Sequence, residues 1–244
     1  MLSSSDTVWY FAYGSNMSSA KFTGDRGIIP LKVARVRIPG WILAMEIPGM
    51  PYSEPSFSSI APRAYGDGEE KGFPDVVGVA YLITRAQYKH VIASEGGGTA
   101  YLNLCIAGVP VEATDEEKTG TRVKVWTLGS AIARHPPPAP SLRYMTLLTE
   151  GANESKLPLE YQGYLSQIPT YRLPDSRWTR LGATIFLSIW SPVMSLMEKL
   201  VKGNIREDGN TYLWIVYLVR LVMLFIWLMH DYVFWPMFGR GDGL

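Results

Sequence analysis

Three short stretches of this chain combine residue types suited to binding and transforming a small polar molecule. The first is Tyr13-Gly14-Ser15-Asn16, where an aromatic and apolar run stops in a tight turn. Successive backbone N–H groups in such a turn point into one concavity, and glycine lets a ligand approach the backbone closely. The turn therefore suits a carboxylate or a developing oxyanion. An ordinary turn, in which Asn16 or Ser15 bonds its own backbone, explains the same letters.

The second stretch is "ASEGGGTAY", which places a carboxylate beside uncluttered backbone. Three glycines directly after Glu95 end a predicted helix, and Tyr101 begins the next predicted strand, close enough to orient the carboxylate. A glutamate before glycines is also typical of a solvated helix terminus. The residues alone leave both interpretations open.

The third stretch is "PSLRYMTLLTEGANESKLPLEYQGYL", residues 140–165. Without further context it predicts two packed helices, with Tyr144 and Tyr161 as amphipathic core residues. Its chemical interest depends on what the first two stretches do.

Metal, disulfide and nucleic-acid chemistry receive no support from the composition. The three histidines (His90, His135 and His230) are widely spaced, so neither a zinc site nor a Cys/His pair is expected. One cysteine excludes an internal disulfide framework, and the apolar run around Cys105 predicts a buried structural thiol. With 23 Lys+Arg against 22 Asp+Glu, the net charge of +1 gives no reason to expect a nucleic-acid partner. We expect no metal and no cofactor.

Residues 8–170 are predicted to form one α+β domain that positions these stretches. Strand-like runs dominate, and helices interrupt them without regular βαβ alternation. The runs are rich in β-branched or aromatic residues and are bounded by Gly, Pro, Asn or Asp. They are "VWYFAY", "LKVARVRIPGWILAME", "VVGVAYLI", "AYLNLCIAG" and "TRVKVWTLG".

Helices are expected at three places in this domain. "TRAQYKHVIASE" opens on Thr84, a suitable N-cap, and keeps apolar residues at helical spacing up to Glu95. "PSLRYMTLLTEGANES" follows, with Gly151 as its stop, and then "PLEYQGYLSQI". The proline-rich segments "PGMPYSEPSFSSIAP" and "ARHPPPAPS" are expected to be loops.

The composition changes after about residue 176, and residues 177–238 are predicted to be a hydrophobic helical tail. "YLWIVYLVRLVMLFIWLM" (212–229) carries one charge, Arg220, and approaches the ~20 residues that cross a bilayer as a helix. Aromatic residues toward its ends favour a membrane span at 212–234 over a buried or lipid-surface helix, and the mid-span charge argues against it. The segment 181–197 fits an interfacial helix and a second span equally well.

Basic residues predict which side of the membrane holds the domain. Six precede the apolar helix, and Arg240 follows it. Lys and Arg accumulate on the cytoplasmic side of a span, so the catalytic domain is expected in the cytosol. No signal peptide is expected, because the N-terminus lacks a basic region followed by an apolar one. The six are Arg172, Arg177, Arg180, Lys199, Lys202 and Arg206.

The order of the three stretches resembles the γ-glutamylcyclotransferase family. Its members carry Y-G-S-N at the end of the first strand, then a glutamate followed by glycine with a tyrosine at the start of a later strand. Near the end of the domain they carry P-S-x-x-Y … G-A-x-x-x-x-L-P-x-x-Y. The same pattern occurs here at residues 13–16, at Glu95-Gly96 with Tyr101, at 140–144 and from Gly151 to Tyr161. The resemblance covers about two thirds of the chain, residues 8–170.

The resemblance implies a small α+β fold around a closed or nearly closed β-barrel, with the turn and the glutamate facing one cavity. Family members cleave γ-glutamyl amides by cyclisation: the α-amine of the substrate attacks its own γ-carbonyl carbon and releases 5-oxoproline and the free amine. No water is activated, so the reaction requires neither a metal nor a Ser/His pair. A carboxylate in a partly desolvated pocket can take the proton and return it to the leaving nitrogen.

The resemblance assigns the general acid–base role to Glu95. Donors on Tyr13, Gly14, Ser15, Asn16, Met17 and Ser18 are expected to hold the glutamyl carboxylate or the carbonyl oxygen. Tyr144 is expected to contact the same part of the substrate, and Tyr101 to orient the glutamate. The loop "GGGT" departs from bulkier loops of other members, so the role of Tyr101 and the width of the leaving-group side stay open.

Three functions remain to be separated. The chain could act on simple γ-glutamyl amines, or on glutathione adducts of secondary metabolites, such as precursors of sulfur-containing toxins. The long segment 48–62, the glycines after Glu95 and an apolar tail favour the bulky adduct. A non-catalytic binding or scaffolding protein would use the same pocket, although it has no need of an unpaired carboxylate there.

Overall fold

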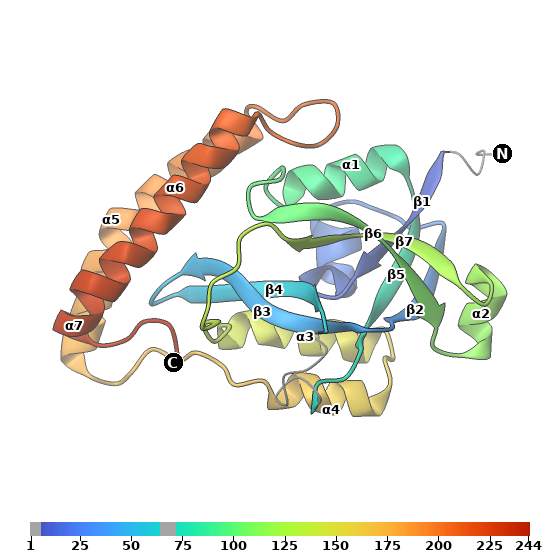
Figure 1. Cartoon of the computed structure of the whole chain (residues 1–244), viewed down its shortest axis with the longest axis horizontal. Helices are drawn as coiled ribbons and strands as arrows, with labels where there is room; N and C mark the ends of the chain where they lie inside the picture. Colours follow the sequence, from blue (N-terminus) through green and yellow to red (C-terminus); the bar gives the residue numbers. More distant parts are fainter. Residues whose placement is uncertain (1–5, 64–71) are drawn as a thin grey trace.

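A closed five-stranded barrel forms the centre of the computed structural model, which describes residues 6–63 and 72–244 (Figure 1). Its strands are neighbours in the order β1-β5-β2-β6-β7, and the barrel closes by parallel pairing of β1 with β7. The other neighbouring strands are antiparallel. The barrel strands are β1 (Thr7–Ala12), β2 (Lys32–Ile38), β5 (Val76–Thr84), β6 (Tyr101–Pro110) and β7 (Val123–Ser130).

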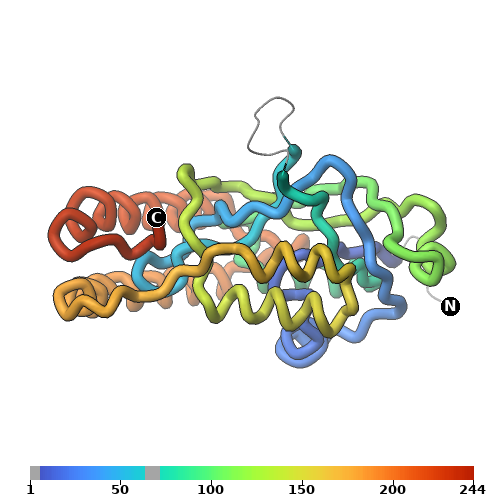
Figure 2. The backbone as a smooth tube through the Cα atoms, turned by 90° about the horizontal axis from the view of Figure 1, so that it is seen from below, coloured from blue at the N-terminus to red at the C-terminus, as the bar shows by residue number. Residues whose placement is uncertain are grey.

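Helices pack on opposite sides of this barrel. In Figure 1, α1 (Arg85–Ser94) lies above it, and α3 (Leu142–Glu154) and α4 (Leu159–Gln167) lie side by side below it, as Figure 2 also shows. The short α2 (Ala113–Thr119) lies at the far end of the molecule from the C-terminal helices. The main hydrophobic core lies between these layers, and its fully buried side chains include Phe11, Phe22, Ile83 and Leu148. The predicted α+β class with a β-barrel is therefore confirmed.

Local signals in the sequence account for most of these elements. The five predicted strand regions all contain strands, and the second holds both β2 and β3 (Trp41–Met50), separated at Pro39-Gly40. The predicted helix start is confirmed, because the hydroxyl of Thr84 accepts from the backbone N–H of Gln87, whose side chain caps Thr84 in return. The helix α2 was not predicted. The proline-rich segment 133–141 lacks helix and extended strand, as expected.

The prediction of a loop at 48–62 is wrong. β3 runs through Pro48 to Met50 and pairs with β4 (Glu54–Pro62) in a separate two-stranded sheet. Each strand of a two-stranded sheet keeps one free edge, so a proline that lacks an N–H donor is tolerated there. Pro48 lies opposite Ser56 in this ladder.

The prediction of a buried Cys105 is also wrong, because its side chain is exposed. One face of β6 carries Asn103, Cys105 and Ala107, all exposed, whereas Leu104 and Ile106 on the other face pack against the core. A run of apolar letters does not reveal which face of a strand is covered. Here the face that carries the thiol stays open to solvent.

Gly151 does not end its helix, contrary to the prediction. It lies inside α3, which continues to Glu154. A Cβ atom at Gly151 would lie 2.7 Å from the backbone nitrogen of Ser18 and 2.9 Å from the backbone carbon of Met17. The glycine therefore allows α3 to touch the backbone of the segment that follows β1.

The C-terminal part forms a helical hairpin beside the barrel domain. Its helices are α5 (Arg177–Lys202) and α6 (Leu213–Met229), followed by the π-helical turn η4 (His230–Phe234) and α7 (Trp235–Phe238). Figures 1 and 2 show α5 and α6 side by side at one end of the molecule. By length and composition, Arg177–Lys202 and Leu213–Phe238 could each cross a membrane, although one or two such helices are weak evidence of a span.

Polar contacts fix α6 against the barrel domain. The side chain of Arg220 donates from Nε to the carbonyl oxygen of Thr99 (2.9 Å) and from Nη2 to that of Gly98 (3.3 Å). Nearer its end, Trp227 donates from Nε1 to the carbonyl oxygen of Gly49 on β3 (3.1 Å). Arg220, the charged residue within the predicted span, is therefore hydrogen-bonded to the loop that follows Glu95.

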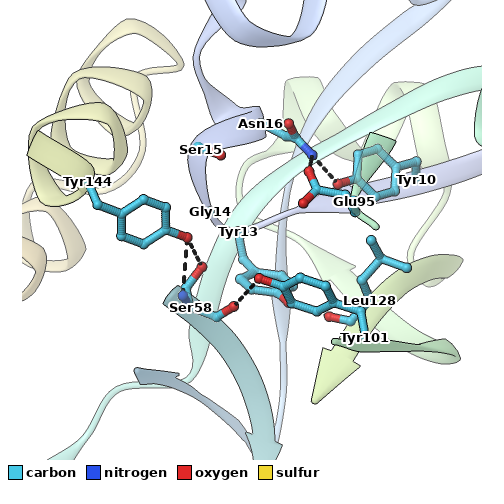
Figure 3. A pocket seen from close by; sticks show the side chains of 10 residues that line it. All are labelled: Tyr10, Tyr13, Gly14, Ser15, Asn16, Ser58, Glu95, Tyr101, Leu128 and Tyr144. Atoms are coloured by element: carbon cyan, nitrogen blue, oxygen red, sulfur yellow. Dashed lines mark hydrogen bonds between the residues drawn. The ribbon is translucent and has the colours of Figure 1, made fainter. Parts of the chain in front are cut away.

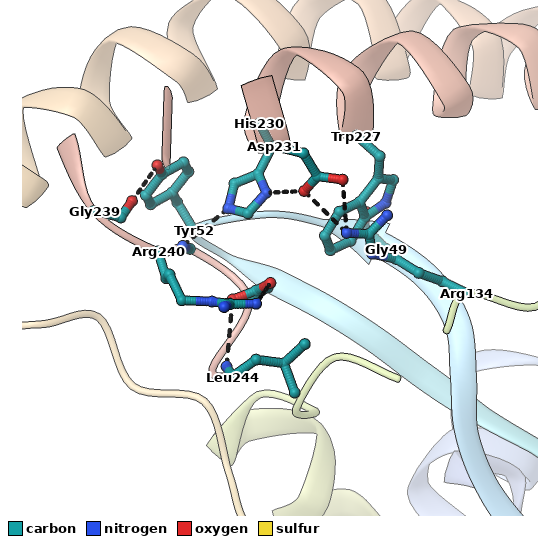
Figure 4. Close-up of polar contacts among 11 residues, drawn as sticks. Gly49, Tyr52, Arg134, Trp227, His230, Asp231, Gly239, Arg240 and Leu244 are labelled. Atoms are coloured by element: carbon teal, nitrogen blue, oxygen red, sulfur yellow. Dashed lines mark hydrogen bonds and ion pairs between the residues drawn. The ribbon is translucent and has the colours of Figure 1, made fainter. Parts of the chain in front are cut away.

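A buried polar network anchors the end of the hairpin (Figure 4). His230 is fully buried, and its Nδ1 lies 2.8 Å from Oδ1 of Asp231, while its Nε2 accepts from the backbone N–H of Gly241 (3.0 Å). Asp231 also pairs with Nη2 of Arg134 at 2.8 Å. The hydroxyl of Tyr52, in the turn between β3 and β4, donates to the carbonyl oxygen of Gly239 (2.6 Å). The last turns of the chain therefore join the β3–β4 hairpin.

The close approach at Gly151 predicts opposite effects of one substitution at two helical glycines. Gly151→Ala should lower the free energy of unfolding by about 1–3 kcal/mol, because the added methyl group overpacks against backbone. Gly163→Ala in α4 is the matched control, since its Cβ would meet nothing within 4 Å. It should stabilise by up to about 1 kcal/mol. Urea unfolding measures both, and equal effects would contradict the packing described here.

Candidate active site

A narrow pocket of about 30 Å³ lies where the turn after β1 meets α1, α3 and β4. Among the described residues that line it, Glu95 carries the one carboxylate. Figure 3 shows Asn16, Glu95 and Tyr10 gathered on one side and Tyr144 reaching Ser58 on the other. The lining residues are Tyr10, Tyr13, Gly14, Ser15, Asn16, Ser58, Glu95, Tyr101, Leu128 and Tyr144.

Glu95 enters the pocket from the C-terminal end of α1, where it is the C-cap. Gly96, Gly97 and Gly98 follow with φ values of +90°, +56° and +87°, a region that favours glycine. The chain can therefore leave the helix at once without covering the carboxylate. The Nδ2 of Asn16 donates to Oε1 of Glu95 at 2.9 Å, so the first two sequence stretches meet as expected.

Arg26 is a third member of this group that the sequence analysis missed. It forms an ion pair with Oε1 of Glu95 and donates from Nε to Oδ1 of Asn16 at 2.9 Å. Both described contacts of Glu95 fall on Oε1, and Oε2 has no described hydrogen-bond partner. The side chains of Arg26 and Glu95 are 14% and 22% exposed, so the pair borders the solvent. No local pattern around Arg26 distinguishes it from an ordinary surface arginine.

The tyrosines of the pocket are neutral hydrogen-bonding groups. Burial raises the pKa of Tyr144 to about 12, and it raises the pKa values of Tyr10, Tyr13 and Tyr101 further. Their hydroxyl groups therefore stay protonated near neutral pH and do not act as bases. Among the described residues that line the narrow pocket, Glu95 is therefore the candidate to accept a proton.

Tyr144 lies at the other wall of the pocket, 2.7 Å from the hydroxyl of Ser58, and its oxygen accepts from the backbone N–H of Ser58 (3.1 Å). A Cβ atom at Gly14 would lie 2.6 Å from the Ser58 hydroxyl and 3.2 Å from the Tyr144 hydroxyl. Gly14 has φ −114°, so it is required for this close approach and not for a left-handed backbone. Ser58 was missed because its segment was predicted to be a loop, and its burial on a strand depends on long-range contacts.

The turn itself is a short 3-10 helix, η1 (Ser15–Met17). The backbone N–H of Met17 bonds the carbonyl oxygen of Gly14 (3.0 Å), and that of Ser18 bonds Ser15 (3.2 Å). The first N–H groups of a helix have no partner within it, and Gly14 supplies no side-chain cap. Ser15 and Asn16, which begin this helix, both line the pocket. Met17 points into the main core and Ser18 is buried, and neither lines the pocket.

Tyr13 and Tyr101 line the floor of the pocket and bond to backbone. The hydroxyl of Tyr13 donates to the carbonyl oxygen of Leu128, and the hydroxyl of Tyr101 donates to that of Ser58 at 3.2 Å. Tyr101 therefore does not hold Glu95 through a described hydrogen bond, and Asn16 and Arg26 do so instead.

A second cavity, of about 640 Å³, adjoins the narrow pocket and shares Ser15, Glu95, Tyr101 and Tyr144 with it. Its volume falls within the range of small-molecule sites. Glu95 thus stands between a tight polar recess and a wide chamber. Within the described residues, no group of three or more His, Cys, Asp or Glu side chains is placed to hold a metal ion.

Solved structures with this arrangement of strands share the fold. A structure titled gamma-glutamyl cyclotransferase superposes with a TM-score of 0.54 at 20% identity, covering 70% of this chain and 92% of its own. An uncharacterized human protein gives a TM-score of 0.55 at 20% identity, with 70% and 93% covered. At this identity the likeness concerns the fold alone.

Sequence relatives are closer and extend over the tail. The gamma-glutamyl cyclotransferase aclK of Aspergillus oryzae is 40% identical, covering 97% of this chain and 90% of the relative. The gamma-glutamyl cyclotransferase gliK of Aspergillus fumigatus is 32% identical, with 97% and 89% covered. Residues 176–237 match the family described as the AclK C-terminal domain. This chain therefore belongs to the γ-glutamyl cyclotransferase family, as the resemblance of its motifs predicted.

Proposed function

We propose that this γ-glutamyl cyclotransferase acts on glutathione-derived conjugates in the biosynthesis of secondary metabolites, such as sulfur-containing toxins. The observation that carries the proposal is the position of Glu95, which lines both a tight polar recess and a chamber of about 640 Å³. The γ-glutamyl group occupies the recess side, and the departing amine with its substituent occupies the chamber.

Glu95 moves the protons of the reaction in this proposal. The α-nitrogen of the substrate attacks the γ-carbonyl carbon, a C–N bond closes the five-membered ring, and the amide C–N bond breaks. Of the three protons on the α-ammonium group, one stays on the ring nitrogen of 5-oxoproline. The other two reach the leaving nitrogen, which departs as an ammonium ion. A single carboxylate within reach of both nitrogens can carry them, with its free Oε2 facing the substrate.

The surrounding groups hold the substrate and the carboxylate. The Asn16 amide and the Arg26 guanidinium fix Oε1 of Glu95. Ser15, Asn16 and Tyr144 line the recess. In this proposal the N–H groups at the start of η1 and the Tyr144 hydroxyl stabilise the oxyanion or hold the glutamyl carboxylate. Met17 and Ser18 contribute by fixing this turn and not by touching the substrate.

The chamber favours a conjugate over a simple γ-glutamyl amine. A leaving group as small as alanine would fill little of 640 Å³ and would leave apolar walls wet. The segment 48–62, expected to widen this side, supplies Pro48, Met50 and Phe57 to the wall. We assign residues 8–170 to the catalytic domain and residues 177–238 to the tail.

We further infer that the tail holds the enzyme at the cytosolic surface of a membrane. In the most apolar windows of its two long segments, 22% and 33% of the residues are buried, unlike helices in a soluble core. Because Arg220 and Trp227 dock α6 on the catalytic domain, the opposite face is the one available to lipid. A large exposed apolar patch of this kind marks an interaction surface. On α6 it comprises Leu213, Trp214, Tyr217, Leu221, Leu224, Phe225 and Leu228.

Replacing Glu95 by Gln should keep the fold, since the side chains are nearly isosteric, and should remove the proton carrier. We expect kcat for 5-oxoproline release to fall by about 10⁴-fold, the upper end for general acid–base catalysis, because one group serves both nitrogens. Glu112→Gln is the control, since Glu112 is a surface residue paired with Arg35. Turnover above about a tenth of wild type in Glu95→Gln would refute the assignment.

Membrane attachment is measured by flotation with vesicles of phosphatidylcholine and phosphatidylserine. The full chain should float with the vesicles, and the double variant Leu221→Glu/Leu224→Glu should stay in the dense fraction, because charge on the lipid face opposes insertion. The control Ile29→Glu/Leu159→Glu changes two exposed apolar residues of the catalytic domain and should float like wild type. A wild-type chain that remains dense would overturn the inference.

A further inference from the structure

The C-terminal hairpin forms part of the wall of the chamber beside Glu95. α5 contributes Met194 and Glu198, and α6 contributes Val219 and Met223. Each pair is four residues apart, so each helix turns one face toward the chamber. Met223 and Val219 are only 7% and 8% exposed, whereas apolar residues on other faces of the hairpin are exposed to solvent. The face of α6 that lines the chamber is therefore the buried one.

The hairpin is fixed at both rims of the chamber. At one rim, Arg220 bonds the carbonyl oxygens of Gly98 and Thr99, and the backbone N–H of Thr211 donates to the carbonyl oxygen of Gly97 at 2.9 Å. At the other rim, Trp227 bonds Gly49 on β3, as Figure 4 shows. These contacts fix the position of α6 relative to the loop that directly follows Glu95. The wall is therefore built into the fold and is not an accidental neighbour.

Apolar side chains from both the catalytic domain and the tail line the chamber, beside charged groups at Lys21, Glu54, Arg143 and Glu198. The tail methionines face apolar groups from the catalytic domain, and methionine adapts to irregular apolar shapes. The γ-glutamyl group, with its charged amine and carboxylate, gains nothing from such a surface. The apolar groups are therefore placed for the substituent on the leaving amine. Those of the catalytic domain are Ile47, Pro48, Met50, Phe57, Ile132 and Leu147.

We propose that Met194, Val219 and Met223 are specificity-determining residues that contact the leaving group of the substrate. The chain then selects γ-glutamyl amides whose leaving amine carries a bulky apolar substituent. This inference rests on the proposed cyclotransferase reaction and adds that the tail, besides any role at a membrane, is part of the substrate site. The barrel domain supplies the chemistry, and the hairpin supplies the choice of substrate.

The test compares two substrates in the full-length chain. γ-Glutamyl-alanine has a small leaving group, and S-benzylglutathione has a large apolar one. Wild type should have the higher kcat/KM for S-benzylglutathione. Met194→Trp fills the chamber from a partly buried position. It should lower the ratio of kcat/KM for S-benzylglutathione to kcat/KM for γ-glutamyl-alanine at least about tenfold. Val219→Phe is a second variant on the other helix, expected to act in the same direction.

Ile189→Trp is the matched control, because Ile189 lies on α5 and is 50% exposed, outside the chamber lining. Its ratio should stay within about twofold of wild type. Thermal unfolding shows which variants are folded. A folded Met194→Trp or Val219→Phe with the wild-type ratio overturns this inference alone. A wild type that prefers γ-glutamyl-alanine overturns both this inference and the proposed action on conjugates, and leaves the cyclisation reaction standing. A wild type that releases 5-oxoproline from neither substrate overturns the proposed function and the inference with it.

Discussion

The site depends on the hydrogen bond that joins Asn16 to Glu95, 79 positions apart in the chain. Antiparallel pairing of β1 with β5 places Thr7 opposite Thr84, so α1 starts beside the beginning of β1. Ten helical residues rise about 15 Å, and the six residues of β1 extend about 20 Å. The end of α1 therefore returns to the turn after β1, where the carboxylate meets the amide.

The loop after Glu95 connects this contact to the rest of the molecule. Its three glycines free the carboxylate, and its carbonyl groups at Gly97, Gly98 and Thr99 receive donors from the tail. Without the barrel the carboxylate would have no partner. Without the hairpin the chamber next to it would lose one wall. The loop that follows Glu95 therefore connects the proposed proton carrier to the proposed specificity-determining hairpin.

Local patterns in the sequence predicted the parts of the fold that local physics decides. The capped start of α1 and the barrel strands follow from propensity and capping. The meeting of the turn with Glu95 was expected from the family resemblance of the motifs and not from local physics. Arg26, Ser58 and the docking of Arg220 were missed because they depend on long-range contacts. The exposure of Cys105 was wrong for a similar reason, since strand letters do not state which face the neighbouring elements cover.

The central claim is that the substrate's own amine, and not water, attacks the γ-carbonyl carbon beside Glu95. The direct measurement is the reaction of S-benzylglutathione in H₂¹⁸O, followed by mass analysis of the γ-glutamyl product. Cyclisation predicts 5-oxoproline that contains no ¹⁸O, because no solvent oxygen enters the ring. Glutamate that carries one ¹⁸O atom in its γ-carboxylate would show hydrolysis and would contradict the account.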